Sequence, residues 1–559
     1  MSEYKASWFA QYPKGVDQTI DPENYASLVE LLEASIEKFN ELPAFDNFGK
    51  SITYRQLDQL SLAFAAFLQK ECGLHKGDRI AIQMPNLLQN PIAIFGALRA
   101  GLTVVNTNPL YTAREMEHQF NDSEVKAVVI LANFAFNLEK VIANTKIKKV
   151  IVTEIGDLLG GIKKPIINFV VKHVKKMVPN YNLPHAIKFN YALKKGKQLK
   201  YERPKITNKD IAFLQYTGGT TGISKGAALT HRNMVANMEQ ISQWMKPKLV
   251  EREEIVITAL PLYHIFALTV NCLSFMKIGA RNVLITNPRD MPAFIKELKK
   301  YKFTVFTGVN TLFNGLLNRP EFASVDFRYF KIAVGGGMAV QDIVATKWKK
   351  LTGVPLVEGY GLTETSPVLS CNPIDGTERI GTIGLPLPST EIKILDDDGI
   401  EVPTGENGEI CARGPQVMPG YWNNPEESEM VFRDGWFKTG DIGRIDEDGF
   451  IKIVDRKKEM INVSGFNVYP NEIENVLSQH PKVLEVGAVG AKDAKSNEVV
   501  KVFVVKKDDS LTKEEIIAYC RESLTAYKVP KLVEFKDELP KSNIGKILRR
   551  KLVEVEQPV

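Results

Sequence analysis

The chain has 559 residues, of which 44% are hydrophobic and 25% are charged. This length exceeds what one hydrophobic core usually organises, so we expect two or more domains. The formal net charge of +6 is small for such a length, which argues against nucleic acid as the main partner.

The cysteines and the apolar stretches narrow the class further. The five cysteines lie far apart and form no C-x-x-C pair, which is typical of reduced thiols and not of a disulfide scaffold or a zinc site. The N-terminus lacks the apolar region of a signal peptide. The longest apolar stretches fall short of the roughly 18 residues that span a bilayer. We therefore expect a cytoplasmic protein, at most peripheral on the inner face of the membrane.

Short apolar runs alternate with helical patterns along most of the chain. A helix is predicted at 291–302 because its apolar residues recur at helical spacing. Strands are predicted at 127–131, 149–153, 211–215, 254–260 and 303–307. This alternation favours an α/β fold with largely parallel sheets.

The segment from Lys163 to Lys205 is strongly basic, with twelve lysines and arginines and one acidic residue. A helix predicted at 165–178 has an apolar face and a lysine face. The apolar face carries Ile166, Phe169, Val170, Val174 and Met177, and the other carries Lys172, Lys175 and Lys176. One interpretation is contact with an anionic membrane surface. The other is a helix packed on the core, with its lysines in solvent.

The sharpest local signal is the run YTGGTTGISKG at 216–226, which follows a predicted strand and precedes a predicted helix. Glycines let consecutive N–H groups converge on an anion, and hydroxyls and Lys225 add donors and charge. The spacing does not fit the Walker A pattern. We predict that this loop binds the phosphates of a nucleotide. The residues concerned are Thr217, Gly218, Gly219, Thr220, Thr221, Gly222, Ser224, Lys225 and Gly226.

A dense run of charge, DRKKE at 455–459, follows a strand predicted at 450–454. Beyond it, two strands at 483–489 and 499–505 and a helix at 513–524 could form a small α+β unit. We therefore predict an N-terminal domain of residues 1–457 and a C-terminal domain of residues 458–559.

The glycine-rich loop resembles the phosphate-binding signature of the adenylate-forming superfamily, which includes acyl-CoA synthetases, luciferases and the adenylation domains of peptide synthetases. Further motifs of that superfamily follow in order: PLYHIFAL (261–268), GGGM (335–338), GYGLTETSP (359–367), GWFKTGD (435–441), DRKKEMINVSGFNVYP (455–470) and PKSNIGK (540–546). The runs VSGFNVYPNEIE and VPKLVEFKDELPKSNIGKILRR most resemble bacterial long-chain fatty-acid–CoA ligases. The resemblance implies a large multi-subdomain α/β domain with the adenylate-forming fold and a small, mobile α+β C-terminal domain.

The resemblance also implies a reaction and roles for four residues. A fatty acid would attack the α-phosphorus of ATP, and CoA would then take the acyl group from the adenylate, with Mg²⁺ as the metal cofactor. Lys546 resembles the lysine that bridges the carboxylate and the α-phosphate, a task that suits a flexible ammonium. Glu364 resembles the magnesium carboxylate and Thr363 its phosphate-side neighbour. His264 would lie beside the acyl carboxylate.

The remaining positions that the resemblance implies belong to the nucleoside site, the hinge between the domains, the pantetheine channel and the acyl tunnel. Gly335, Gly336, Gly359 and Gly361 would pack flat backbone against adenine, with Tyr360 stacked on it. Asp441 resembles the carboxylate that accepts from the ribose hydroxyls, with Arg456 as its partner. Lys458 falls where the hinge would be, and Gly465 would line the pantetheine channel. Segments 271–276 and 307–316 are candidates for the acyl tunnel.

Several alternatives stay open at this point. An aryl-CoA ligase of the coumarate type differs mainly in its pocket, and a luciferase-like oxygenase shares the adenylating motifs. A non-enzymatic lipid-binding protein would not need Lys225, Glu364, Asp441 and Lys546 together. The preferred acid and the formation of a homodimer are not determined by the sequence.

Overall fold

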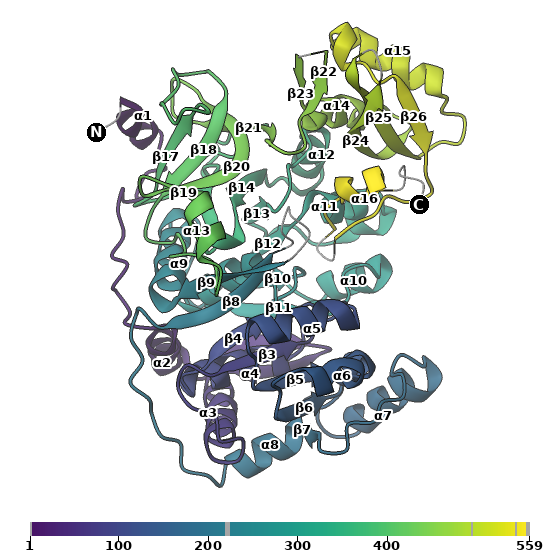
Figure 1. Cartoon of the computed structure of the whole chain (residues 1–559). Helices are drawn as coiled ribbons and strands as arrows, with labels where there is room; N and C mark the ends of the chain where they lie inside the picture. The colour runs from purple at the N-terminus through teal and green to yellow at the C-terminus, as the bar shows by residue number, and fades with distance from the viewer. Residues whose placement is uncertain (1–2, 218–223, 465, 494–495, 543–544, 555–559) are drawn as a thin grey trace.

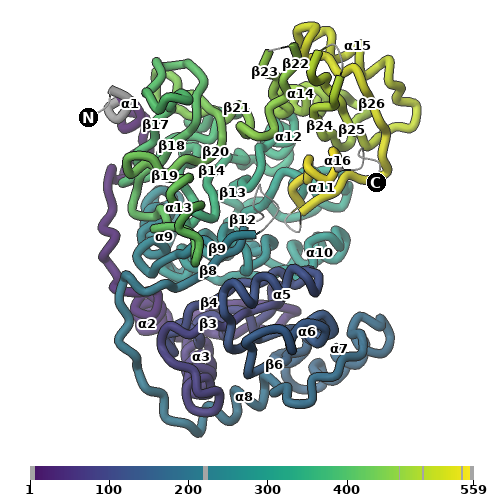
Figure 2. The backbone as a smooth tube through the Cα atoms, viewed as in Figure 1, coloured from purple at the N-terminus to yellow at the C-terminus, as the bar shows by residue number. Residues whose placement is uncertain are grey.

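The computed structural model describes residues 3–217, 224–464, 466–493, 496–542 and 545–554. Four β-sheets and the helices around them build a large N-terminal body and a smaller C-terminal unit, drawn in yellow at the upper right of Figure 1. The tube in Figure 2 shows the same arrangement. This confirms the predicted fold class, a large α/β domain followed by a small α+β domain.

The first sheet has seven strands in the order β7-β6-β5-β3-β4-β8-β9. Neighbouring strands are parallel except for β8 and β9, which form an antiparallel pair. The strands are β3 (Arg79–Gln83), β4 (Thr103–Asn106), β5 (Ala127–Leu131), β6 (Lys149–Thr153), β7 (Ile187–Lys188), β8 (Ile211–Thr217) and β9 (Lys225–Thr230). Helices cover both faces, which is why β5 is buried along its whole length.

The second sheet has nine strands in the order β16-β15-β14-β13-β12-β10-β11-β1-β2. Its centre, from β14 to β1, is parallel, and both edges are antiparallel. The strands are β1 (Pro43–Asn47), β2 (Lys50–Thr53), β10 (Ile255–Thr258), β11 (Arg281–Leu284), β12 (Val305–Gly308), β13 (Ile332–Gly335), β14 (Leu356–Gly361), β15 (Val368–Cys371) and β16 (Leu385–Pro386). One continuous hydrophobic core packs against both of these sheets.

The third sheet is antiparallel throughout and follows the order β17-β18-β20-β19, with β21 paired to β20. Its strands are β17 (Glu391–Leu395), β18 (Gly408–Arg413), β19 (Phe432–Arg433), β20 (Trp436–Ile445) and β21 (Ile451–Arg456). The prediction of largely parallel sheets is therefore wrong for this region. Two residues join β19 to β20 and five join β20 to β21, and connections this short require antiparallel pairing.

The C-terminal sheet has the order β23-β22-β25-β24, with β26 paired to β25. Its strands are β22 (Ile461–Val463), β23 (Phe466–Val468), β24 (Val483–Asp493), β25 (Asn497–Lys506) and β26 (Leu532–Phe535). Its helical segments are α14 (Pro470–Ser478), α15 (Lys513–Ser523), η7 (Ala526–Lys528) and α16 (Arg549–Glu554). Apolar residues between 461 and 533 form a core of their own, separate from the main one.

The helices of the N-terminal body begin where the sequence supplies caps. Thr230 caps α9 by accepting from the backbone N–H of Asn233, whose side chain returns the bond. The α-helices are α1 (Glu3–Ala10), α2 (Leu28–Phe39), α3 (Tyr54–Lys70), α4 (Gln89–Arg99), α5 (Ala113–Asp122), α6 (Ala135–Val141), α7 (Lys163–Phe169), α8 (Phe189–Gly196), α9 (His231–Met245), α10 (Met291–Leu298), α11 (Asn310–Leu317), α12 (Asp342–Thr352) and α13 (Pro425–Val431). The shorter helical segments are η1 (Ala132–Phe134), η2 (Ile142–Asn144), η3 (Val170–Val174), η4 (Ala267–Ser274), η5 (Pro320–Ser324) and η6 (Thr363–Thr365).

Most predicted elements are present, with ends shifted by a few residues. The strands predicted at 127–131 and 149–153 coincide with β5 and β6. The helix predicted at 291–302 ends earlier, at Leu298. The helix predicted at 165–178 is α7 continued by the π-helical η3. Among the described residues, no helix is both long and apolar enough to cross a bilayer.

The apolar face of α7 and η3 does not pack on the core. Exposed fractions are 56% for Ile166, 60% for Phe169, 64% for Val174 and 52% for Met177. The polar Asn168 instead faces the body, where its side-chain oxygen accepts a hydrogen bond from the backbone N–H of Gly156 at 2.7 Å. The interpretation of a core-packed helix is therefore wrong.

Candidate active site

A cavity of about 1910 Å³ lies where the first three sheets meet the C-terminal domain. The predicted site residues that line it are Thr217, Ser224, Lys225, His264, Gly336, Gly359, Tyr360, Gly361, Thr363, Glu364, Asp441, Arg456, Lys458 and Lys546. The predicted Gly218, Gly219, Thr220, Thr221, Gly222 and Gly465 lie outside the described residues. Residues predicted from motifs as much as 300 positions apart are thus brought to one cavity.

Two predicted glycines serve packing and do not line the cavity. A Cβ at Gly226 would lie 3.0 Å from the ring of Tyr216, and one at Gly335 would lie 2.4 Å from Cγ2 of Val340. Neither position tolerates a side chain without movement of its neighbours. Both glycines therefore allow close packing next to the site without lining the cavity.

The phosphate side of the cavity is built on the hairpin of β8 and β9, where Thr217 pairs with Lys225. The loop between these strands is the one predicted to bind phosphate. The ammonium of Lys225 forms an ion pair with Glu427 and lies 5.6 Å from the centroid of the Tyr421 ring. A cation at the base of this loop suits a triphosphate.

Glu364 lies in η6, immediately after β14, and is buried. Its Oε1 accepts a hydrogen bond from the Tyr421 hydroxyl at 2.8 Å. Burial raises the pKa of the Glu364 carboxyl, and the bond from Tyr421 opposes that rise. Among the described residues, no group of three His, Cys, Asp or Glu side chains could hold a metal ion. A single carboxylate beside a triphosphate nevertheless fits Mg²⁺, which takes its other ligands from phosphates and water.

Asp441 lies in β20 and contacts the side chains of Tyr360 and Arg456. It lies opposite Arg456 in the β20–β21 ladder. The Tyr360 hydroxyl donates to Oδ2 of Asp441 at 2.7 Å, and Nε of Arg456 lies 3.2 Å from Oδ1. The carboxylate is therefore held through both of its oxygens.

The glycines of β14 and of the turn after β13 let two segments of backbone approach closely. A Cβ at Gly361 would lie 1.9 Å from the carbonyl oxygen of Pro367. A Cβ at Gly336 would lie 3.0 Å from the carbonyl oxygen of Gly359. Glycine at these positions lets the two segments lie closer together than a side chain would permit.

Lys546 reaches the cavity from the C-terminal domain. The Ser542 hydroxyl accepts from its backbone N–H at 3.0 Å, and its backbone carbonyl accepts from Ser542 N–H at 2.7 Å. Burial, and after it the positive charge of Arg456, lower the pKa of the ammonium to about 8. A lysine with this pKa is largely protonated at pH 7 and can neutralise two anions.

His264 follows β10 in the PLYH run and lies in the cavity. Burial lowers the pKa of its imidazole to about 4, and the charge of Lys546 acts in the same direction. Its Nδ1 lies 3.3 Å from the backbone N–H of Phe266 and accepts from it. The ring is therefore neutral at pH 7 and can donate from Nε2.

The junction at Lys458 lies in the turn between β21 and β22. Near this junction, the guanidinium of Arg549 forms ion pairs with three carboxylates: Asp455 at 3.2 Å, Glu474 at 2.7 Å and, in a shorter contact, Glu459. Asp455 also accepts from the backbone N–H of Asn471 at 2.8 Å. The end of β21 is therefore bonded to the C-terminal domain, and the boundary predicted at Lys458 stays a prediction.

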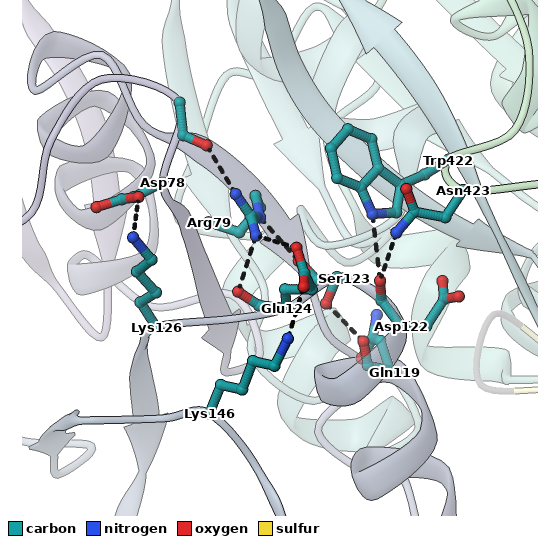
Figure 3. Close-up of polar contacts among 11 residues, drawn as sticks. Asp78, Arg79, Gln119, Asp122, Ser123, Glu124, Lys126, Lys146, Trp422 and Asn423 are labelled. Carbon is teal, nitrogen blue, oxygen red and sulfur yellow. Dashed lines mark hydrogen bonds and ion pairs between the residues drawn. The ribbon is translucent and has the colours of Figure 1, made fainter.

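A polar brace joins the first sheet to the loop at 420–424. The indole N–H of Trp422 and the amide of Asn423 both donate to the carbonyl oxygen of Asp122, at 3.2 and 3.4 Å (Figure 3). The guanidinium of Arg79 lies 5.6 Å from the Trp422 ring centroid and donates to the carbonyl oxygen of Ser123 at 2.9 Å. The backbone N–H of Trp422 bonds the carbonyl oxygen of Gly226 at 2.8 Å, so the brace holds β9 and with it Lys225.

Sequence analysis missed Tyr421, Glu427, Trp422 and Arg549. Each acts through a partner far away in the chain: 57 residues separate Tyr421 from Glu364, and 94 separate Arg549 from Asp455. No local spacing marks such pairs. The only local indication of a functional role was the adjacent aromatic pair Tyr421 and Trp422, which follows Gly420 and precedes a run of turn residues.

The other end of the cavity is apolar. Its wall comes from α9, η4, β15 and the turns after β15 and β16. The residues are Ile241, Trp244, Met245, Phe266, Val270, Val368, Cys371, Ile374 and Leu387. The segments 271–276 and 307–316, predicted for the acyl tunnel, do not line this cavity. Asn271 instead bonds the hydroxyls of Thr258 and Thr307 inside the core.

Comparison with known proteins bears on this site. The family model "AMP-binding enzyme" matches residues 32–422, and "AMP-binding enzyme C-terminal domain" matches residues 472–546. A long-chain-fatty-acid–CoA ligase of Escherichia coli O6:H1 is 58% identical over 548 residues, or 98% of each chain. One of Bacillus subtilis is 40% identical over 98% of each chain. The crystal structure of the anthranilate CoA ligase AuaEII with anthranoyl-AMP matches with a TM-score of 0.84 and 25% identity, covering 96% of this chain and 99% of that one.

Proposed function

The chain belongs to the AMP-binding enzyme family, and we propose that it is a long-chain-fatty-acid–CoA ligase. It converts a fatty acid, ATP and CoA to acyl-CoA, AMP and diphosphate through an acyl-adenylate. The observation that carries the proposal is the position of Lys546. The C-terminal domain supplies this cation to the cavity that Glu364 and Asp441 line from the N-terminal domain.

In the first half-reaction, a carboxylate oxygen attacks the α-phosphorus and the bond to the β-phosphate oxygen breaks. Two anions must meet, so the site has to neutralise charge and hold the reactants in line. Lys546 would bridge the carboxylate and the α-phosphate, and Lys225 would take the outer phosphates. Asp441 would hold the ribose, and neutral His264 would donate a hydrogen bond beside the carboxylate.

In the second half-reaction, the thiolate of CoA attacks the acyl carbon and AMP leaves. Pyrophosphate departure and pantetheine approach cannot easily share one arrangement of the site. We therefore propose that the C-terminal domain turns about Lys458 between the two steps, withdrawing Lys546. Gly465 would then line the pantetheine channel.

Mg²⁺ fits this site as a cofactor. Glu364 would hold it together with phosphate oxygens, and the ion would add positive charge beside the triphosphate. The Tyr421 hydroxyl would keep the carboxylate of Glu364 aimed at that position.

The cavity favours a long aliphatic acid over an aromatic one. Similarity points the same way, since the ligases named for long-chain fatty acids are up to 58% identical, whereas a feruloyl-CoA synthase of Amycolatopsis sp. is 31% identical. The apolar end of the cavity extends to α9. Burying about a dozen methylenes there would stabilise the bound acid by roughly 10 kcal/mol.

The test is the release of AMP from ATP with a panel of acids of rising length, with and without CoA. We expect palmitate to give AMP and acyl-CoA, coumarate to give little of either, and pyrophosphate exchange into ATP to depend on the fatty acid. If no fatty acid supports exchange in the presence of magnesium, the proposal fails.

We further propose that α7 and η3 place the protein on an anionic membrane at the cytoplasmic face. The patch of Ile162, Ile166, Phe169, Val174 and Met177 is exposed, with Ile162 exposed to 77%. Lys172, Lys175 and Lys176 are exposed next to it. Burial of apolar side chains at the headgroup boundary and attraction of lysines to acidic lipid act together on such a surface.

Sedimentation with phosphatidylglycerol vesicles tests the membrane contact. Binding should weaken as salt rises from about 50 to about 500 mM, because screening removes the lysine contribution. Phe169→Glu should abolish binding, whereas Ile400→Glu, at an exposed apolar residue of another surface, should not. Equal sedimentation of both variants would contradict the proposal.

A further inference from the structure

A tryptophan, Trp244, lines the apolar end of the cavity, and two neighbouring groups hold it in place. Ile241, Trp244 and Met245 lie at positions i, i+3 and i+4 of α9, which puts them on one face of the helix, and all three line the cavity. Trp244 is only 2% exposed. It is the largest side chain at this end, so it decides how far the cavity continues.

The indole of Trp244 has a fixed orientation. Its Nε1–H donates to the carbonyl oxygen of Asn372 at 3.1 Å in a buried bond. Turning the ring away would leave both groups unpaired inside the protein, which is costly. The side chain therefore keeps one orientation and does not swing aside to open the cavity.

The N-terminal segment lies behind this ring. The Tyr12 ring meets Trp244 edge to face, with 5.1 Å between the ring centroids, and the Tyr12 hydroxyl donates to the carbonyl oxygen of Pro386 at 2.5 Å. Phe9 and Trp8 continue the aromatic row, with 5.2 and 5.9 Å between successive rings. In Figure 1 this segment, in purple, runs down the edge of the molecule beside α9. The row leaves Trp244 no space to retreat into.

We propose that Trp244, backed by Tyr12, is the end wall of the acyl pocket and sets the longest fatty acid that the enzyme accepts. The inference rests on the proposed function, since it gives the apolar end of the cavity to the acyl chain. The methyl end of the acid packs against the indole, and an acid that is too long must fold back or displace the ring. Chain-length preference is then determined by a residue far from the reacting carboxylate.

The experiment compares kcat/KM for saturated acids of increasing length in the wild type and in Trp244→Ala. Each methylene that enters the vacated space should raise kcat/KM by about fourfold. The ratio between an acid two carbons beyond the wild-type optimum and the optimum itself should therefore rise about sixteenfold. Tyr12→Ala should produce a smaller shift in the same direction, because it removes only the support behind the ring.

Two further variants separate this role from a loss of stability. Ile241→Phe fills the same end of the cavity and should move the optimum to shorter acids, which general destabilisation cannot do. Trp244→Phe and Trp348→Phe form a matched pair, because Trp348 is also fully buried but does not line the cavity. Only the first should change the length profile.

The outcomes distinguish this proposal from the proposed function. If the wild type activates fatty acids and all variants keep its length profile, the end wall lies elsewhere and the activity stands. If Trp244→Ala instead lowers KM for every acid equally, the indole is a gate and the wall proposal is overturned. If the wild type activates no fatty acid, both proposals fall.

Discussion

The two sides of the active site are built differently. Glu364, Tyr360 and Asp441 lie on or next to strands of the N-terminal body, and buried hydrogen bonds fix them there. Lys546 lies in a turn of a domain with a separate core. The described hydrogen bonds that tie that domain to the helices below it are Thr311 to Gly545 at 3.0 Å, Asn475 to Asp342 at 3.4 Å and Lys507 to Asn318 at 3.1 Å.

This difference explains how one protein can run two reactions in sequence. A preformed nucleotide site costs no reorganisation when ATP binds. A lysine on a domain with its own core can be present for the first step and absent for the second. The contrast between a fixed and a removable half can be tested by four experiments at three positions.

The largest effect is expected for Lys546→Ala. Loss of the bridging cation should lower adenylation by about a hundred- to thousandfold, or about 3–4 kcal/mol, by analogy with a lost oxyanion donor. Thioester formation from supplied acyl-AMP should be largely spared. Lys541→Ala, a nearby lysine paired with Glu485 at 2.6 Å, is the control. Equal loss of both half-reactions would mean that Lys546 is not specific to the first.

The pH dependence of adenylation tests the role of Lys546 without altering the structure of the site. The pKa of Lys546 is about 8, and the protonated form is the one that neutralises the anions. Adenylation kcat/KM should therefore fall above about pH 8, by about tenfold for each further unit, since this parameter reports groups of the free enzyme. Lys546→Arg should lose that alkaline limb because guanidinium stays charged. A limb that persists in this variant would assign the titration to another group.

Tyr421→Phe tests the fixed half. Removing the hydroxyl leaves Oε1 of Glu364 without its 2.8 Å donor. A hydrogen bond to a charged group contributes about 1.5 kcal/mol or more, so the KM for magnesium-loaded ATP should rise about tenfold. Tyr301→Phe removes a comparable bond to Asp46 at 3.1 Å, away from the cavity, and should leave KM unchanged. An unchanged KM in Tyr421→Phe would show that Glu364 needs no positioning.

The smallest effect is expected for Thr311→Val. This variant removes the bond from the Thr311 hydroxyl to the carbonyl oxygen of Gly545, next to Lys546. Adenylation should fall about threefold to fivefold, corresponding to about 1 kcal/mol, and thioester formation should not. Ser324→Ala removes a hydroxyl bond inside the N-terminal body and serves as the matched control. A slower second half-reaction in Thr311→Val would mean that this contact persists after the domain turns.

Much of the site could be predicted because its motifs are local. The GYGLTE run determines both the end of β14 and the position of Glu364, and the TGD run within β20 places Asp441 opposite Arg456 in one ladder. Strands such as β5 were predicted to the residue because a continuous apolar run has no other stable use in a short buried segment. In the third sheet only β21 was predicted, as the strand at 450–454, because the other strands mix apolar and polar residues.

The sequence by itself identified the family and the candidate site residues, because the glycine-rich loop, Glu364, Asp441 and Lys546 all lie in short motifs. Only the tertiary structure decided which distant residues contact one another: Tyr421 and Glu364, Arg549 and Asp455, and Tyr12 and Trp244. It also decided that the apolar face of α7 points to solvent. The physical reason is that a local pattern reports backbone periodicity and near neighbours. Contacts between segments hundreds of residues apart depend on how whole sheets and helices pack.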